Sequence, residues 1–167
     1  MMHEAESYAT LIEELELAAE HVSGQYEKFL EMRRRYESAD AEDEMAIAAL
    51  GYTVHNLYNA IENYFLRIAK FFENNLDNDS WHRDLINRMA LSIEGVRPAL
   101  LGKDQLEPFH ELRAFRHVFR VIYDSTLDPR KLAIAADHVE PAVGALRSAH
   151  QSYLVTLREI KNGLAAD

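Results

Sequence analysis

The hydrophobic positions of this chain recur with helical spacing almost from end to end. Apolar residues lie three and four positions apart over about residues 4–38 and again over about 43–74, and each series marks one buried face of a long helix. A polar cluster at residues 74–80 ends the second helix. Asp79 or Ser80 can cap a short third helix over residues 81–92, because the side-chain oxygen accepts a bond from the first free amides.

Two more helices follow a loop that contains two glycines and a proline. Asp104 and Glu107 have the spacing of a capping box, which predicts that a fourth helix opens there and runs through Tyr123. The fifth helix starts at Pro129, since a first turn tolerates a residue without an amide donor. Pro141 lies inside the remaining pattern and is expected to kink or divide that helix.

These elements predict an all-α fold, an antiparallel bundle of four long helices with the short third helix packed across one end. A chain of 167 residues, 48 % hydrophobic and 28 % charged, can bury one continuous core, so we expect a single domain over residues 1–167. Cysteine is absent from the sequence, which favours a reducing, cytoplasmic environment. The pattern predicts neither an export signal nor a membrane span.

The net charge of −10 is distributed unevenly along the chain. Residues 1–50 hold 4 Lys or Arg against 13 Asp or Glu, so the first helix, over about 1–40, is strongly acidic. Residues 97–131 hold 7 basic against 5 acidic side chains. A locally basic surface for an anionic partner is therefore compatible with the sequence, whereas a global field that steers RNA from a distance is not.

The local excess of cations centres on the run FRHVFRVIY at residues 115–123. On a helix, four apolar residues form the core-facing stripe: Leu112, Phe115, Phe119 and Ile122. Arg116 and Tyr123 lie together at one edge of that stripe, with Arg113 and Arg120 just beyond them. The sequence thus predicts a cluster of arginines beside an apolar surface.

Two valines fall outside the stripe, at positions that an isolated surface helix would keep polar. We expect Val118 and Val121 to be covered either by the fifth helix or by a second copy of the chain. A two-fold pairing across this helix would bring two arginine clusters together around one cleft.

The arginines also have an ordinary structural explanation. Arginines beside an apolar stripe commonly lay their methylenes along the core and hold the guanidinium in water. Glu62, with Tyr58 one turn before it, lies at the edge of the second helix's stripe and is expected to pair with Arg116. Both explanations remain open on the sequence alone.

Over about residues 46–160, the chain resembles the HepT-like group of the HEPN superfamily, which comprises small helical bundles of prokaryotic toxin–antitoxin modules. Four blocks carry the resemblance: LYNAIENYF at 57–65, SWHRDLINRM at 80–89, VRPALL at 96–101 and FRHVFRVIYDSTLD at 115–128. The resemblance implies an all-helical homodimer whose paired helices line a shared cleft. It also implies metal-independent RNA cleavage by an Arg-x-x-x-x-His-x-Tyr motif.

In this sequence Arg116 takes the arginine place of that motif and Tyr123 takes the tyrosine place. The arginine would hold the scissile phosphate, while the histidine would move protons. The histidine place is Val121, and an aliphatic side chain cannot transfer a proton. His117, next to the arginine, and His82, in the third helix, are the two candidate substitutes.

We therefore expect hydrolysis to be weak or absent, while Arg113, Arg116 and Arg120 still bind an anion such as RNA or a nucleotide. In HepT-type pairs a nucleotidyltransferase antitoxin modifies the motif tyrosine, so the resemblance implies such a partner for Tyr123. Two hypotheses stay open, a ribonuclease toxin and a non-catalytic subunit that binds phosphate or the nucleotidyltransferase. No metal or cofactor is expected, because only Glu107 and the residue three positions later have the spacing of a di-iron bundle.

Overall fold

The computed structural model describes residues 2–40, 43–72, 81–121 and 127–166. The described residues form five α-helices and one 3-10 helix, and they contain no β-strand: α1 (Met2–Ser38), α2 (Glu44–Phe72), α3 (Trp81–Met89), η1 (Lys103–Gln105), α4 (Glu107–Val121) and α5 (Pro129–Ala166). The predicted all-α fold with four long helices and one short helix is confirmed. The third helix ends at Met89, three residues before the predicted end.

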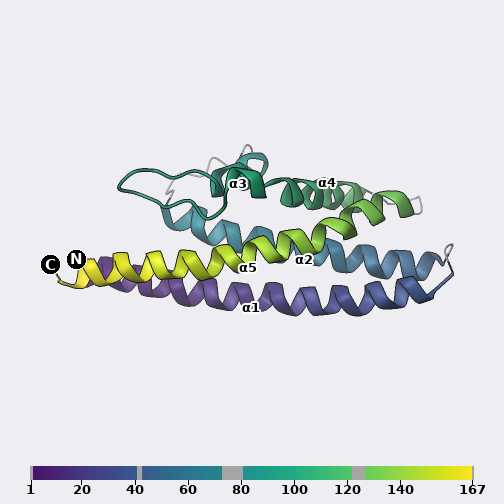
Figure 1. Cartoon of the computed structure of the whole chain (residues 1–167), viewed down its shortest axis with the longest axis horizontal. Coiled ribbons are helices and arrows are strands. Elements are labelled where there is room, and N and C mark those ends of the chain that lie inside the picture. The colour runs from purple at the N-terminus through teal and green to yellow at the C-terminus, as the bar shows by residue number, and fades with distance from the viewer. Residues whose placement is uncertain (1, 41–42, 73–80, 122–126, 167) are drawn as a thin grey trace.

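The helices pack as an antiparallel bundle. Figure 1 shows α1, α2 and α5 along the length of the molecule, with α3 and α4 following one another above α2 and the two termini at the same end. Ion pairs fix the register on α1: Glu14 pairs with Arg67 of α2 at 3.2 Å, and Glu16 pairs with Arg158 of α5 at 2.6 Å. Helices α3 and α4 together occupy the fourth position of the bundle.

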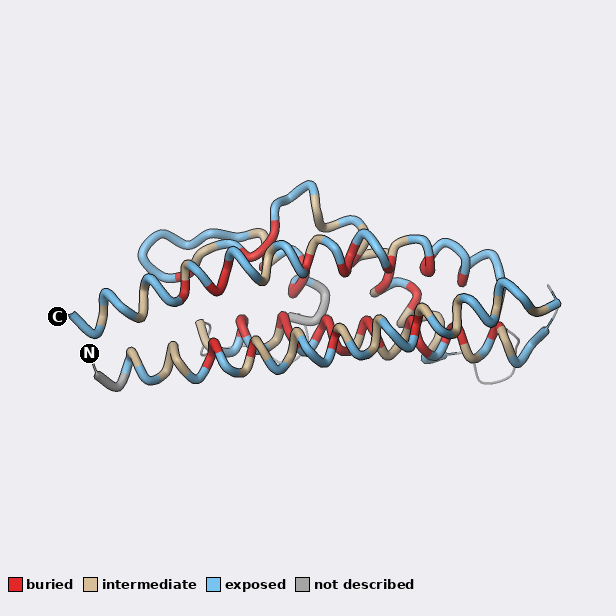
Figure 2. Tube along the Cα trace, turned by 60° about the horizontal axis from the view of Figure 1, so that its bottom comes forward, coloured by how far each residue is buried: buried red, intermediate tan, exposed pale blue. Residues whose placement is uncertain are grey.

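The core lies along the inner faces of the helices, where the buried positions of Figure 2 gather. Its largest fully buried side chains include five aromatic residues: Phe29, Tyr58, Tyr64, Phe65 and Phe109. Helix α2 contributes most, because it contacts α1, α3, α4 and α5. That central position explains why its sequence is the most hydrophobic of the helices and why it can hold polar groups away from water.

Two aspartates cap helices in the described chain. The Asp43 carboxylate accepts from the amides of Met45 and Ala46 at 2.9 and 3.1 Å, which satisfies the first free donors of α2. Asp128 accepts from the Arg130 amide at 2.9 Å and opens α5. These bonds with Arg130 hold the pKa of the Asp128 carboxyl below its usual range.

The predicted capping box at the start of the fourth helix was wrong in its residues. Asp104 lies inside η1, and the side chain that folds back is Gln105, whose Oε1 accepts from the Gly102 amide at 2.8 Å. Helix α4 then begins at Glu107. The prediction failed because the chain makes a separate 3-10 turn before the α-helix starts.

Pro141 does not divide the fifth helix, which is continuous over Pro129–Ala166. In Figure 1 the green N-terminal part of α5 turns upward towards α4, while the yellow part follows α1. Asp79 and Ser80, the predicted caps of the third helix, lie outside the described residues. Within the described residues, none of the helices is both long enough and apolar enough to cross a bilayer.

Candidate anion-binding site

Helix α4 lies antiparallel on α2, and ring contacts fix its register. Near its start, the Phe109 ring meets Phe65 at a centroid distance of 5.3 Å. Near its end, Phe119 stacks on His55 at 5.0 Å with an interplanar angle of 28°. Phe115, between them, is buried, so the core-facing stripe predicted for this helix is confirmed in its described part.

Arg116 is held by two side chains of α2. Its Nε donates to Asn59 Oδ1 at 2.7 Å, and its Nη2 lies 3.3 Å from Glu62 Oε2. The Arg116 side chain is 24 % exposed and the Glu62 side chain 8 % exposed. The predicted pairing of Arg116 with Glu62 is confirmed, and the Arg116 side chain stays partly exposed while two of its nitrogens contact α2.

Tyr58 precedes Glu62 by one turn on α2, and Arg113 precedes Arg116 by one turn on α4. Tyr58 is 1 % exposed, and burial raises the pKa of its hydroxyl, with the Glu62 carboxylate adding to the increase. The positive charges of Arg113 and Arg116 act against that increase in the pKa. Arg113 is itself partly buried. The structure therefore brings three of the predicted site residues, Tyr58, Arg113 and Arg116, to the same region of the α2–α4 interface as Glu62.

Sequence reasoning missed two members of this cluster, His55 and Asn59. The Asn59 amide nitrogen lies 3.0 Å from His55 Nε2, so the polar contacts continue from Arg116 along α2. Residues 55, 59 and 62 are spaced i, i+4 and i+7 on one face of a helix that is otherwise apolar there. That spacing of polar residues was the available signal.

The remaining cations lie at the surface. Arg120 and His117 are exposed, and Val121 is 59 % exposed, so α5 does not cover Val121 within this chain. Val118 is partly buried. The histidine that follows Arg116 is thus exposed in a single chain, because successive helical residues are rotated by about 100°.

Two predicted site residues cannot be placed from this structure. Tyr123 lies outside the described residues, and so does the side chain of His82, whose backbone belongs to α3. Their roles therefore stay predictions.

One comparison with known proteins identifies the family. A family model for HepT-like proteins matches residues 49–157, which is more than half of the chain. The chain belongs to the HepT-like family. Neither the curated proteins nor the solved structures contain a match to it. The matched segment of this HepT-like protein runs from α2 to α5. It includes every residue of the α2–α4 cluster, which comprises His55, Tyr58, Asn59, Glu62, Arg113 and Arg116.

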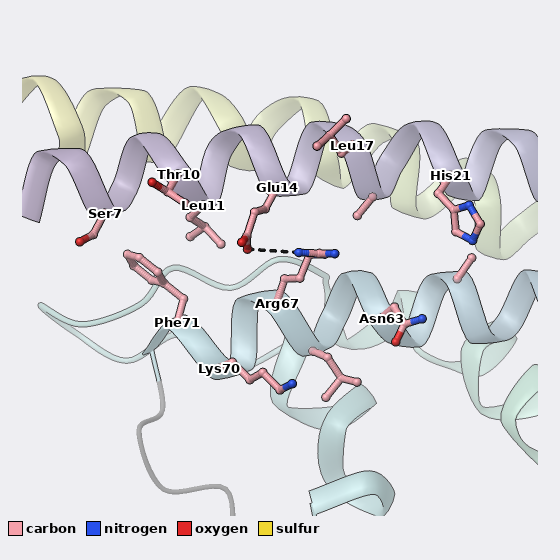
Figure 3. A pocket seen from close by; sticks show the side chains of 13 residues that line it. Ser7, Thr10, Leu11, Glu14, Leu17, His21, Asn63, Arg67, Lys70 and Phe71 are labelled. Atoms are coloured by element: carbon pink, nitrogen blue, oxygen red, sulfur yellow. Dashed lines mark ion pairs between the residues drawn. The ribbon is translucent and has the colours of Figure 1, made fainter.

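A further hollow of this HepT-like protein lies between α1 and α2 (Figure 3). It is an open groove of about 820 Å³, and the Glu14–Arg67 ion pair spans it at 3.2 Å. Among the described residues, no group of three or more His, Cys, Asp or Glu side chains is arranged to hold a metal ion.

Proposed function

We propose that this HepT-like protein is the RNA- or nucleotide-binding component of a toxin–antitoxin pair, with a phosphate held at Arg116. The observation that carries the proposal is the arrangement of the guanidinium, whose Nε and one Nη are fixed by Asn59 and Glu62. A planar guanidinium fixed on one edge presents its remaining N–H donors in the fork geometry that fits phosphate oxygens. The neighbouring Arg113 and Arg120 add positive charge on both sides along α4.

Cleavage of the bound RNA is expected to be weak or absent. Proton transfer needs a titratable group within hydrogen-bond reach of the 2′-hydroxyl or the leaving oxygen. The motif position holds Val121, which is apolar and 59 % exposed. A ribonuclease that uses His117 is the second candidate, because this exposed histidine follows Arg116 directly and a partner subunit could complete its surroundings.

Binding of a fluorescent oligouridine to the full chain tests the phosphate site. We expect Arg116→Ala to weaken binding by roughly tenfold or more, since its charge-assisted bonds to phosphate are removed. It should also reduce the slope of log affinity against log salt by about 0.7, the value for one neutralised phosphate on a single strand. The matched control is Arg158→Ala, which removes an arginine paired with Glu16 on another face.

Equal affinity of the wild type and Arg116→Ala would refute the phosphate site. Gel analysis of the same oligonucleotide after incubation separates the two candidates, because the binding function predicts that it stays intact. Robust cleavage that disappears in His117→Gln would instead establish the ribonuclease.

A homodimer is part of the proposal, because α2 and α4 expose large apolar side chains near the N-terminal end of α2 and the C-terminal end of α4. Met45 is 82 % exposed, Tyr52 58 % and Val121 59 %. Light scattering should give twice the chain mass of 19.2 kDa. Val121→Glu should shift the protein towards the monomer, whereas Val155→Glu, at a valine of similar exposure (53 %) on α5, should leave the dimer intact. A monomeric wild type would contradict this part of the proposal.

Modification of Tyr123 by a nucleotidyltransferase partner is supported by family membership and by the tyrosine at the motif position. In that reaction the phenolic oxygen would attack the α-phosphate of ATP, form a phosphodiester and release pyrophosphate, with the phenol proton lost to solvent. Incubating the chain with the neighbouring gene product and ATP should add nucleotide mass to a Tyr123 peptide. Tyr123→Phe should abolish the addition, and an unmodified wild type would refute the idea.

A further inference from the structure

His55 completes a chain of side-chain contacts that ends at Arg116. The guanidinium Nε donates to Asn59 Oδ1 at 2.7 Å, so the amide oxygen of this asparagine faces α4. Its amide nitrogen then faces His55 Nε2, 3.0 Å away. The orientation of a single amide group therefore couples the histidine of α2 to the arginine of α4.

The direction of these bonds fixes the protonation state of His55. An amide nitrogen only donates, so Nε2 of His55 must accept and carry no proton. In the neutral ring the proton is then on Nδ1, which is buried and has no hydrogen-bond partner among the described residues. In this series of hydrogen bonds Arg116 donates to Asn59, and Asn59 donates to His55.

Protonation of His55 is incompatible with this arrangement. An imidazolium carries an N–H on both nitrogens, so Nε2–H would face the amide hydrogens of Asn59. Turning the amide over would restore that bond but would place its NH₂ group against the Arg116 Nε–H donor. In either orientation one of the two bonds is broken.

The surroundings of His55 act in the same direction. The ring stacks on Phe119, and burial lowers the pKa of His55 below its usual value. The charged groups whose fields act on the ring are Arg116 and Arg120 of α4, and both lower the pKa further. Near pH 7 the ring is therefore neutral and able to accept the asparagine bond.

We propose that His55 is a positioning residue for the anion site: its unprotonated Nε2 orients Asn59, which fixes the guanidinium of Arg116, so that protonation of His55 weakens phosphate binding. The inference rests on the proposed function and deepens it by assigning a proton-dependent control to the same site. The expected direction of the pH effect is distinctive. Acidification makes the protein more positive, so general electrostatics alone would strengthen RNA binding, whereas protonation of His55 is expected to weaken it.

Nuclear magnetic resonance of the ring nitrogens tests the contact chain without RNA. At about pH 7.5 the His55 signals should show the tautomer with the proton on Nδ1, which is the less common neutral form. The Arg116 Nε–H signal should be protected from exchange with water and should lose that protection with the same midpoint as His55 protonation. A proton on Nε2 at neutral pH, or an Arg116 signal that does not respond, would overturn the inference.

Oligouridine binding from about pH 8 to about pH 4.5 tests the consequence with a probe whose phosphodiester charge is constant. The wild type should lose affinity by roughly fivefold, the effect of one hydrogen bond, along the His55 titration. His55→Gln supplies an amide oxygen that accepts from Asn59 and cannot be protonated, so this variant should bind normally at neutral pH and keep its affinity in acid. His55→Leu should already bind weakly at neutral pH.

His21→Gln on α1 is the matched control, since it removes an exposed histidine outside the contact chain and should retain the acid loss of the wild type. An acid loss that persists unchanged in His55→Gln would refute the positioning role. If the wild type binds no oligouridine at any pH, the proposed function fails, and the resonance experiment still decides whether His55 controls Arg116.

Discussion

The Glu62 carboxylate and the Arg116 guanidinium are charged and at least partly buried, so other bonds must replace those they would make with water. Moving a carboxylate out of water costs several kcal/mol unless its bonds are replaced. The Glu62 side chain, at 8 % exposure, meets the guanidinium at 3.3 Å, while Asn59 takes the adjacent Nε–H. Such fixed geometry is what a phosphate-binding arginine requires, because little ordering is left to occur on binding.

Glu62→Gln should reveal the strength of that ion pair in the free energy of unfolding. We expect a decrease of about 1–3 kcal/mol, because the partly buried guanidinium keeps its charge without its carboxylate. Urea denaturation measures the change. Glu14→Gln makes the same substitution in an ion pair whose carboxylate is 46 % exposed, and it should change stability by less than about 0.5 kcal/mol. Equal effects of the two variants would contradict the structural account.

Sequence reasoning reached part of this site. It predicted the Arg116–Glu62 pair because both residues flank apolar stripes. It missed His55 and Asn59, because the facing register of two helices depends on ring packing, here Phe119 on His55, that no single helix encodes. The spacing of these polar residues marks one face of α2, but only the partner helix shows what they contact.

At the scale of elements, periodicity gave the helices and their order, but local chain chemistry set their ends. Pro141 remained inside a continuous α5, because neighbouring packing can hold a helix together around one missing donor. The extra turn at η1 replaced the expected cap, because Asp104 lies inside this 3-10 turn, where the Gln105 side chain accepts from the Gly102 amide. Such choices are nearly equal in free energy, which is why sequence patterns do not resolve them.

The packing between α2 and the end of α4 depends on a glycine. A Cβ atom added at Gly51 would lie 2.6 Å from Leu127 Cδ2 and 3.2 Å from Phe119 Cε2. We expect Gly51→Ala to lower the free energy of unfolding by about 1–3 kcal/mol, because both neighbours must shift. Thermal or urea unfolding measures this decrease.

Gly144→Ala provides the opposite control, because nothing lies within 4 Å of the added atom and the site is inside α5. Alanine is the better helix former, so this variant should gain about 0.5–1 kcal/mol. A Gly51→Ala variant that is as stable as Gly144→Ala would show that α4 does not pack closely on α2.

At the scale of the whole molecule, three histidines of the described chain join helices in their neutral form. Besides His55, His110 donates to Asn87 of α3 at 3.0 Å and His150 bonds to the Tyr64 hydroxyl of α2 at 2.9 Å. Burial lowers the pKa of all three. Each of these histidines therefore connects a helix pair through a group that acid would charge.

The free energy of unfolding should consequently fall as the pH drops below about 6.5, the value of an unfolded histidine. A native pKa below that value means that the unfolded state binds protons first, so the stability present at neutral pH is lost on acidification. Urea unfolding across this range measures the slope. His150→Gln should show a smaller slope than the wild type, and an identical slope would contradict the coupling.

The central claim is that Arg116 holds an anion while its inner edge is fixed by α2, and arginine side-chain resonances test it most directly. Adding oligouridine to the ¹⁵N-labelled chain should shift the Nε–H signals of Arg113, Arg116 and Arg120 and leave those of Arg67 and Arg158, which pair with α1 carboxylates, unchanged. An unmoved Arg116 signal, or shifts spread evenly over all exposed arginines, would contradict the account.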